Sequence, residues 1–264
     1  FELPKSFTMQ SRIYQFKGRD GQTKLQAYFS ADVHDVDKEY ETFGLDAYAD
    51  EGLFLVRSDG NFVGSSRAHL QLSRADQVGH RFVHALELDG VSPSDTIAGY
   101  SLELRTVGDW RTAVSRDKIS LRDFSGDTLQ MSDVVLASEI RNDKPIPYFS
   151  QNISKISNVH LYFEIYNLSP NDQLKSHYTV ATSIQPQRRN GVAKLLHSIF
   201  GNDHKITSVF DVSGNSRDDR YPFALNVADI PNGNYDLIIE VTDNVSGHTV
   251  SQTLPITITD DHGF

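Results

Sequence analysis

The acidic segment at residues 31–41 (ADVHDVDKEYE) carries the side chains best suited to bind a metal ion. Calcium prefers six to eight oxygen ligands at about 2.4 Å, and acidic loops commonly supply them. Asp32, Asp35 and Asp37 are therefore candidate calcium ligands. Because the segment has neither the spacing of an EF-hand nor a glycine-rich repeat, we favour a solvated acidic loop, with no cofactor, over a calcium site.

The spacing of the other titratable residues does not predict catalysis. His80 and His84 are four residues apart, but they flank the sequence RFV, which has the pattern of a strand. A rise of about 3.3 Å per residue separates them by about 13 Å, too far for one metal ion with bonds of about 2 Å. The sequence also has no phosphate-binding glycine motif and no G-x-S-x-G motif. We therefore predict no catalytic residues and no enzymatic activity.

Residues 159–168 place an unusual set of side chains on one face of a predicted strand. His160, Tyr162, Glu164 and Tyr166 alternate with apolar residues and are expected to point away from the core. Exposed tyrosines can stack on a sugar or be buried by a partner protein, because the side chain has an apolar ring and a polar tip. They can equally form cross-strand pairs or pack against another domain. We favour packing, with a ligand or partner face as the alternative.

Length and composition restrict the class of protein. The 264 residues suggest about two domains, and a hydrophobic content of 38% is enough for two packed cores. A net charge of −10 without a basic stripe argues against a nucleic-acid partner. No apolar run approaches the roughly 18 residues of a transmembrane segment, and the lack of cysteine excludes disulfide bonds.

Most of the chain has the pattern of β-strands. Apolar and polar residues alternate over 24–31, 68–72, 100–105 and 235–242, which is typical of a sheet with one face on a core and one in water. Turn sequences separate these runs, and Asp59-Gly60-Asn61 is a strong hairpin signal. Short strands with turns between them predict an all-β fold of sandwich type.

Two parts of the chain resemble each other, which favours an internal duplication. Residues 81–109 and 220–243 share an Arg-aromatic pair, Ala-Leu, a proline-containing turn, Tyr-x-Leu and a final Asp, in the same order. A predicted closing strand follows in each, at 118–123 and 255–260. The segments 21–33 and 157–169 correspond upstream in the same way. We therefore predict two tandem antiparallel β-sandwich domains of immunoglobulin-like type.

The boundary between these domains is predicted near residue 145. The segment 141–157 has two prolines and few periodic positions, as in a short stiff connector. The predicted domains are therefore 1–144 and 145–264. One departure from β-structure is 191–201 (GVAKLLHSIFG), where apolar residues at helical spacing before a glycine predict a short helix in the second domain.

The second half of the chain resembles bacterial GWxTD-domain proteins and similar envelope proteins. The resemblance is carried by LYFEIYNLS (161–169), HYTVATSI (177–184) and the segment from FALNVADI to HTVSQ (223–252), with LQMSDVVLASEI (129–140) before them. The Gly-Trp-x-Thr-Asp motif itself is absent, and the nearest string, at 108–112, is GDWRT. The resemblance implies a β-sandwich and a location outside the cytoplasm, in the periplasm, at the outer membrane or on the cell surface. It implies no catalytic residue.

These observations lead to one functional hypothesis and two alternatives. The first is a non-enzymatic, extracytoplasmic structural or protein-interaction module, which self-assembles or binds a protein partner within a larger envelope or surface assembly. The second is a module that binds a carbohydrate or another ligand through Tyr162 and Tyr166. The third is an accessory domain of an enzyme whose catalytic part lies elsewhere.

Overall fold

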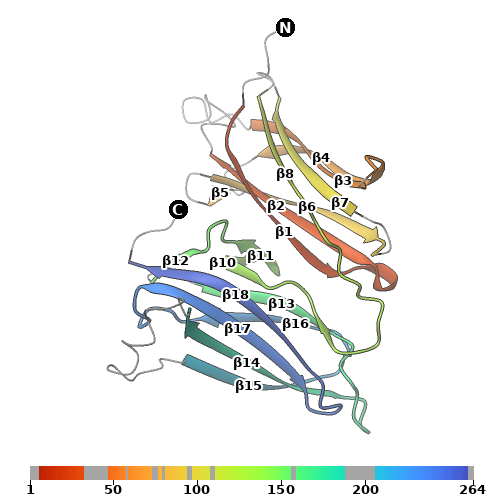
Figure 1. Cartoon of the computed structure of the whole chain (residues 1–264), viewed down its shortest axis with the longest axis vertical. Coiled ribbons are helices and arrows are strands. Elements are labelled where there is room, and N and C mark those ends of the chain that lie inside the picture. The colour runs from red at the N-terminus through yellow and green to blue at the C-terminus, as the bar shows by residue number, and fades with distance from the viewer. Residues whose placement is uncertain are drawn as a thin grey trace. The chain divides into compact units, whose positions relative to one another are not determined.

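A computed structural model describes residues 6–32, 47–57, 59–72, 77–78, 81–93, 97–107, 111–155, 159–187 and 206–260. Apart from one 3₁₀ turn, η1 (Arg19–Gly21), the described elements are strands, so the protein is all-β as predicted (Figure 1). In these residues no helix has the length and apolarity needed to cross a membrane. The chain forms two compact units, Phe1–Gly126 and Asp127–Phe264.

The first unit contains two four-stranded sheets, with the orders β1-β2-β6-β5 and β4-β3-β7-β8. Their strands are β1 (Met9–Lys17), β2 (Thr23–Asp32), β3 (Ala47–Arg57), β4 (Phe62–Leu72), β5 (Gln77–Val78), β6 (Arg81–Val91), β7 (Ile97–Thr106) and β8 (Thr112–Asp117). Alternate residues of β2, including Leu25 and Phe29, share one buried core with Leu53 and Leu55 of β3. Because both sheets contribute to this core, they pack face to face as a sandwich.

The second unit also contains two sheets, with the orders β11-β10-β13-β16 (β9 pairs with β13 as well) and β12-β18-β17-β14-β15. Their strands are β9 (Gln130–Met131), β10 (Val135–Arg141), β11 (Lys144–Pro147), β12 (Asn152–Ser154), β13 (Val159–Tyr166), β14 (Ser176–Pro186), β15 (Ile206–Gly214), β16 (Asp219–Leu225), β17 (Gly233–Asp243) and β18 (Thr249–Thr259). Leu161 and Phe163 of β13 share a buried core with Val180 of β14 and Leu237 of β17.

The two units have the same strand topology. In the first, β1-β2-β6 form one sheet and β4-β3-β7-β8 the other; in the second, β10-β13-β16 and β15-β14-β17-β18 take the same order, and the chain visits these strands in the same sequence. Shared topology is what a duplication predicts. The register differs, because Ala85 pairs with Tyr28 in the first unit whereas Ala224 pairs with His160 in the second. The duplication therefore stays a prediction.

The division between the units lies before the predicted boundary. Residue 144 begins β11, which pairs with β10, and both β9 and β10 pair with β13 of the second unit. The segment from Asp127 onward therefore belongs to the second unit. Pro145 and Pro147 lie in β11, the terminal strand of its sheet, where a missing N–H group costs no ladder hydrogen bond.

Of the two predicted closing strands, only the one in the second unit is present. Residues 255–260 fall largely within β18, but 118–123 are not a strand, because β8 ends at Asp117. Instead the Gln15 side chain accepts a hydrogen bond from the Arg122 N–H and donates one to the Ser120 carbonyl, both at 2.9 Å. The closing-strand prediction is therefore wrong for the first unit. The predicted helix at 191–201 lies outside the described residues.

Candidate functional site

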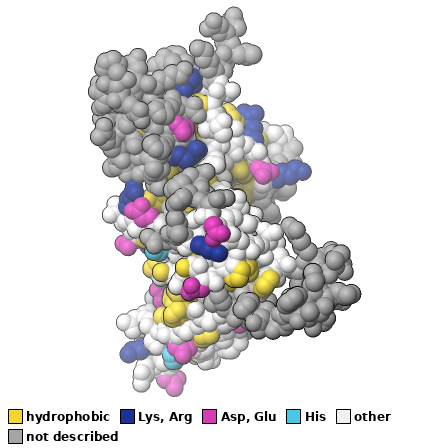
Figure 2. Space-filling model, turned by 90° about the vertical axis from the view of Figure 1, so that its left-hand side faces the viewer, with side chains coloured by type: hydrophobic (Ala, Val, Ile, Leu, Met, Phe, Trp, Pro, Cys, Tyr) yellow, Lys and Arg dark blue, Asp and Glu magenta, His cyan; other side chains and the backbone are white. Residues whose placement is uncertain are grey.

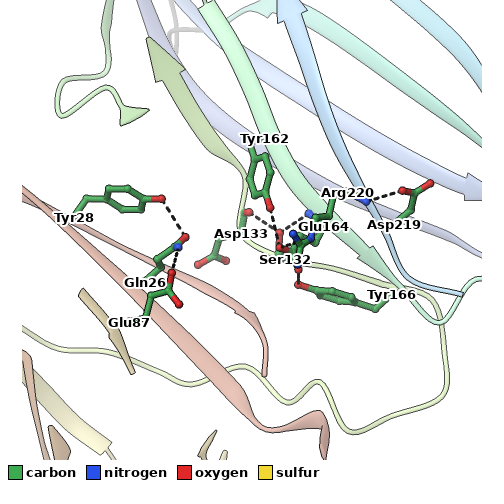
Figure 3. Close-up of polar contacts among 10 residues, drawn as sticks. All are labelled: Gln26, Tyr28, Glu87, Ser132, Asp133, Tyr162, Glu164, Tyr166, Asp219 and Arg220. Carbon is green, nitrogen blue, oxygen red and sulfur yellow. Dashed lines mark hydrogen bonds and ion pairs between the residues drawn. The ribbon is translucent and has the colours of Figure 1, made fainter. Parts of the chain in front are cut away.

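The tyrosine face predicted on β13 is not an open surface. Tyr162, Glu164 and Tyr166 lie on the face of β13 away from the core, as predicted, but they are only 7%, 8% and 3% exposed, so this face is not open to solvent. Each tyrosine hydroxyl donates a 2.9 Å hydrogen bond to a different carboxylate oxygen of Glu164 (Figure 3). Nε of Arg220 on β16 lies 3.5 Å from Glu164 Oε1. His160, the fourth predicted residue, is half-buried.

The backbone fixes Glu164 between its partners. Its N–H donates to Ser132 Oγ and its carbonyl accepts from the Ser132 N–H, both at 2.8 Å. Burial, followed by the nearby negative charge of Glu164, raises the pKa of the Tyr162 hydroxyl. The phenol therefore stays protonated and remains a donor to the carboxylate. The cluster Tyr162–Glu164–Tyr166 satisfies its own polar groups, which supports the packing interpretation.

Only one of the three candidate calcium ligands lies within the described residues. Asp32 ends β2, whereas Asp35 and Asp37 lie outside the described residues, as does His80. Within the described ranges no group of three or more His, Cys, Asp or Glu could hold a metal ion. His84 faces Glu51 of β3, with 3.0 Å between Nδ1 and Oε1.

A groove of about 350 Å³ opens at one edge of the second unit, where the two sheets end. It is lined by β14, by β15 and by β16 with the turn that follows β16. β15 and β16 are terminal strands of their sheets. The volume lies within the range of about 300–1,000 Å³ found for small-molecule sites. Figure 2 shows hydrophobic side chains at the surface of this unit, between charged ones, on the side that faces left in Figure 1.

Aromatic rings form one wall of this groove. Phe210 of β15 and Phe223 of β16 meet edge to face, with ring centroids 4.9 Å apart. Tyr221 continues the row toward the core, where its ring lies 5.6 Å from that of Phe163. Tyr221 and Phe223 pack against the buried core of the unit, and Phe210 and Phe223 are half-buried, so the aromatic wall is partly solvent-accessible.

Polar groups face the same groove. Asn226 anchors the turn after β16, because its side-chain oxygen accepts a 3.0 Å hydrogen bond from the Ala228 N–H. Thr182, Ser208 and Asp229 also line the groove, and their side chains have no hydrogen-bond partner in the described part of the chain. The groove therefore combines aromatic rings with two hydroxyls and one carboxylate that can receive a ligand.

The groove was not predicted from the sequence. The alternation of Ser208, Phe210 and Val212 was a signal for a strand with these side chains directed inward. No local pattern indicates that β15 and β16 are both terminal strands, and this arrangement is what leaves Phe210 and Phe223 at an opening.

The comparisons with known proteins do not identify a family. No family model matches the chain, and no curated protein matches it. Solved structures that match include a putative β-galactosidase from Bacteroides fragilis, with 11% identity, a TM-score of 0.26, and coverage of 91% of this chain and 32% of that one. Another is a calcium-binding mutant (D341A D367A) of Bacteroides uniformis β-glucuronidase 2, with 10% identity, a TM-score of 0.28, and coverage of 88% and 26%. This chain thus spans about a third or less of these proteins.

Proposed function

We propose that the chain is a non-catalytic binding module that takes a saccharide in the groove of the second unit. The observation that carries this proposal is the meeting of Phe210 and Phe223, in one opening of suitable volume, with polar groups that have no hydrogen-bond partner among the described residues. It replaces the tyrosine face of β13 as the binding site, since those tyrosines are buried and bonded to Glu164.

The chemistry of a sugar ring matches this lining. A pyranose has C–H groups on its faces, which pack on aromatic rings, and hydroxyls around its edge, which need hydrogen-bond partners. Phe210 offers the apolar contact, while the Asp229 carboxylate accepts hydrogen bonds from two neighbouring hydroxyls. Ser208 and Thr182 can donate or accept as the bound hydroxyl requires.

The wider context follows from the resemblance to GWxTD-domain proteins. We propose that the module works outside the cytoplasm, as a part of a larger surface protein or as an accessory to an enzyme carried elsewhere. Two linked sandwiches suit this role, because a rigid β-scaffold holds a binding groove in a fixed shape.

A structural or protein-interaction role is the second candidate. β15 is a terminal strand, and its outward residue Val209 is 60% exposed. A terminal strand with an exposed apolar side chain can pair with a strand of another protein. In that case the partner would pair with the backbone of β15, and no sugar would be needed.

A glycan array with the whole chain, followed by calorimetric titration of the strongest binder, tests the proposal. We expect Asp229→Asn to weaken binding about tenfold or more, since a hydrogen bond to a charged group is worth about 1.5–3 kcal/mol, and Phe210→Ala to weaken it about tenfold because the aromatic contact with the sugar ring is lost. Val209→Ala is the matched control, because Val209 is on the same strand and faces the other way.

Two outcomes would contradict the saccharide proposal. One is the absence of any glycan bound above background. The other is a bound glycan whose affinity is unchanged in both groove variants, while both variants keep the melting temperature of the wild type. Self-association that Val209→Ala abolishes would instead favour the second candidate.

A further inference from the structure

Aromatic and charged side chains lie next to each other on the outer face of the sheet β4-β3-β7-β8 in the first unit. Leu53 and Leu55 of β3 are buried, so Gly52 and Phe54 lie on the opposite, outer face. Across the ladder Gly52 is paired with Arg67 of β4 and Glu103 of β7. Phe54 is paired with Ser65 and Ser101.

Gly52 allows the Phe54 ring to lie along the sheet. A Cβ atom at position 52 would be 2.4 Å from Cε2 of Phe54, which is closer than any real Cβ contact. The ring therefore occupies the space that a side chain at residue 52 would take. It covers the middle of the sheet, and Phe62, which is 58% exposed, lies beside it with ring centroids 6.4 Å apart.

Arginine side chains lie on either side of the Phe54 ring. The Arg67 guanidinium carbon is 5.0 Å from the centroid of the Phe54 ring, and Arg67 has no ion pair within the described residues. On the other side, Arg116 of β8 donates a 3.1 Å hydrogen bond to Ser101 Oγ, and its side chain is 70% exposed. Glu103 accepts from Ser101 at 2.8 Å and lies 3.7 Å from the Arg116 guanidinium.

The charge of this face differs from that of the whole protein. The chain carries a net charge of −10. On this face the described charged side chains are Arg67, Arg105 and Arg116 against Asp50 and Glu103. Asp50 is bonded to both Arg105 and His69, so its charge is already matched. The remaining excess is positive and is centred on the stacked Arg67.

We propose that this outer face is a second binding site, which takes an acidic saccharide. The sugar ring lies against Phe54 and Phe62, and its carboxylate or sulfate accepts paired hydrogen bonds from Arg67. A guanidinium is suited to this contact because its planar array of N–H groups matches both anions. Stacking on Phe54 holds the Arg67 side chain in place before the ligand arrives.

Calorimetric titration of the whole chain with three oligosaccharides tests this site. The probes are an oligogalacturonate, a sulfated heparin oligosaccharide and a neutral oligosaccharide of the same length. We expect at least one acidic probe to bind more tightly than the neutral one, with an affinity that falls as salt is added. Whether the carboxylate or the sulfate binds better identifies the preferred anion.

Variants locate the binding. Arg67→Gln should weaken acidic-probe binding about tenfold or more, and Phe54→Leu should weaken it by a smaller factor. Arg141→Gln is the control, because Arg141 is a partly exposed arginine of the second unit that pairs with Glu139. Asp229→Asn in the groove should leave acidic-probe binding unchanged, which separates this site from the proposed groove.

The proposal is overturned if neither acidic probe binds more tightly than the neutral one. It is also overturned if Arg67→Gln binds the acidic probes as the wild type does. Because Arg67 is on an outer face and supports no described ion pair, its replacement is not expected to unfold the protein, and an unchanged melting temperature confirms that the comparison is valid.

Discussion

The two units share a topology but use equivalent strands differently. β2 and β13 occupy the same place in their sheets, and both bury polar side chains on the face away from the core. In the first unit Tyr28 donates to Gln26, which donates to Glu87, whereas in the second two tyrosines donate to one Glu164 carboxylate (Figure 3). The backbone ladder thus sets the topology, while the side chains on outer faces and terminal strands make each unit chemically distinct.

The largest expected loss of stability comes from removing a buried phenylalanine, which both units have in their cores. Phe29 of β2 and Phe163 of β13 are fully buried in their respective cores. Phe29→Ala and Phe163→Ala should each lower the free energy of unfolding by about 3–5 kcal/mol, from lost burial and the cavity left behind. Urea denaturation measures both. A cost below about 1 kcal/mol for either would contradict the equivalence of the two cores.

The buried polar clusters should separate the units. Glu164→Ala leaves two tyrosine hydroxyls without their acceptor, and we expect a loss of about 3 kcal/mol in unfolding free energy. Gln26→Ala removes the acceptor of only one tyrosine hydroxyl, that of Tyr28, and should lower the free energy of unfolding by about 1–2 kcal/mol. Equal losses in denaturant melts of the two variants would remove this difference between β2 and β13.

Acid should act more strongly through the second unit. Burial raises the pKa of Asp243, but bonds from Ser246, Ser169 and Val245 outweigh it, so the pKa is lowered overall. A lowered folded pKa stabilises the protein above the unfolded value near 3.9, and the effect is lost as pH falls through the folded pKa. Asp243→Asn should therefore cost about 2 kcal/mol at pH 7 and progressively less below about pH 4.

Asp50 provides the control for this pH effect in the first unit. Its pKa is also lowered, by the hydrogen bond from Arg105 and then by that from His69. The pair is on the solvent-exposed face, where ion pairs contribute less than about 1 kcal/mol. Asp50→Asn should therefore change stability little at pH 7. A larger pH-dependent loss for Asp50→Asn than for Asp243→Asn in melts from pH 2 to 7 would reverse the ranking.

The smallest effect concerns the closing segments. Residues 118–123 are held partly by the Gln15 side chain, whereas β18 is paired along its length with β17. Amide hydrogen exchange should be faster in 118–123 than in 249–259. Gln15→Ala should accelerate exchange of the Arg122 amide and cost about 1 kcal/mol or less. Protection in 118–123 equal to that in β18 would show that the first unit is closed by a continuous ladder.

The sequence predicted the strands well because alternation is a local signal. The runs around Leu25, Tyr100 and Tyr235 all belong to strands, and their apolar positions face a core. The hairpin predicted at Asp59-Gly60-Asn61 joins β3 to β4, with Gly60 at a φ of +82°. The all-β class could therefore be assigned from periodicity and turn residues.

What the sequence did not predict depends on contacts between distant segments. Alternation shows which side chains of β13 face the core, but not that Tyr162 and Tyr166 are buried as well. Residues 118–123 alternate like a strand, yet their hydrogen bonds come from Gln15, more than a hundred positions away. The groove at Phe210 exists because β15 and β16 are both terminal strands. None of these features has a local sequence signature.

Saccharide binding in the groove of the second unit is tested most directly by NMR mapping of the isotopically labelled whole chain during titration with a neutral saccharide selected on the glycan array. We expect chemical-shift changes concentrated at Ser208, Phe210, Phe223 and Asp229, with the strands of the first unit unaffected. Shift changes confined to the first unit, or centred on β13 around Tyr162 instead of the groove, would contradict it.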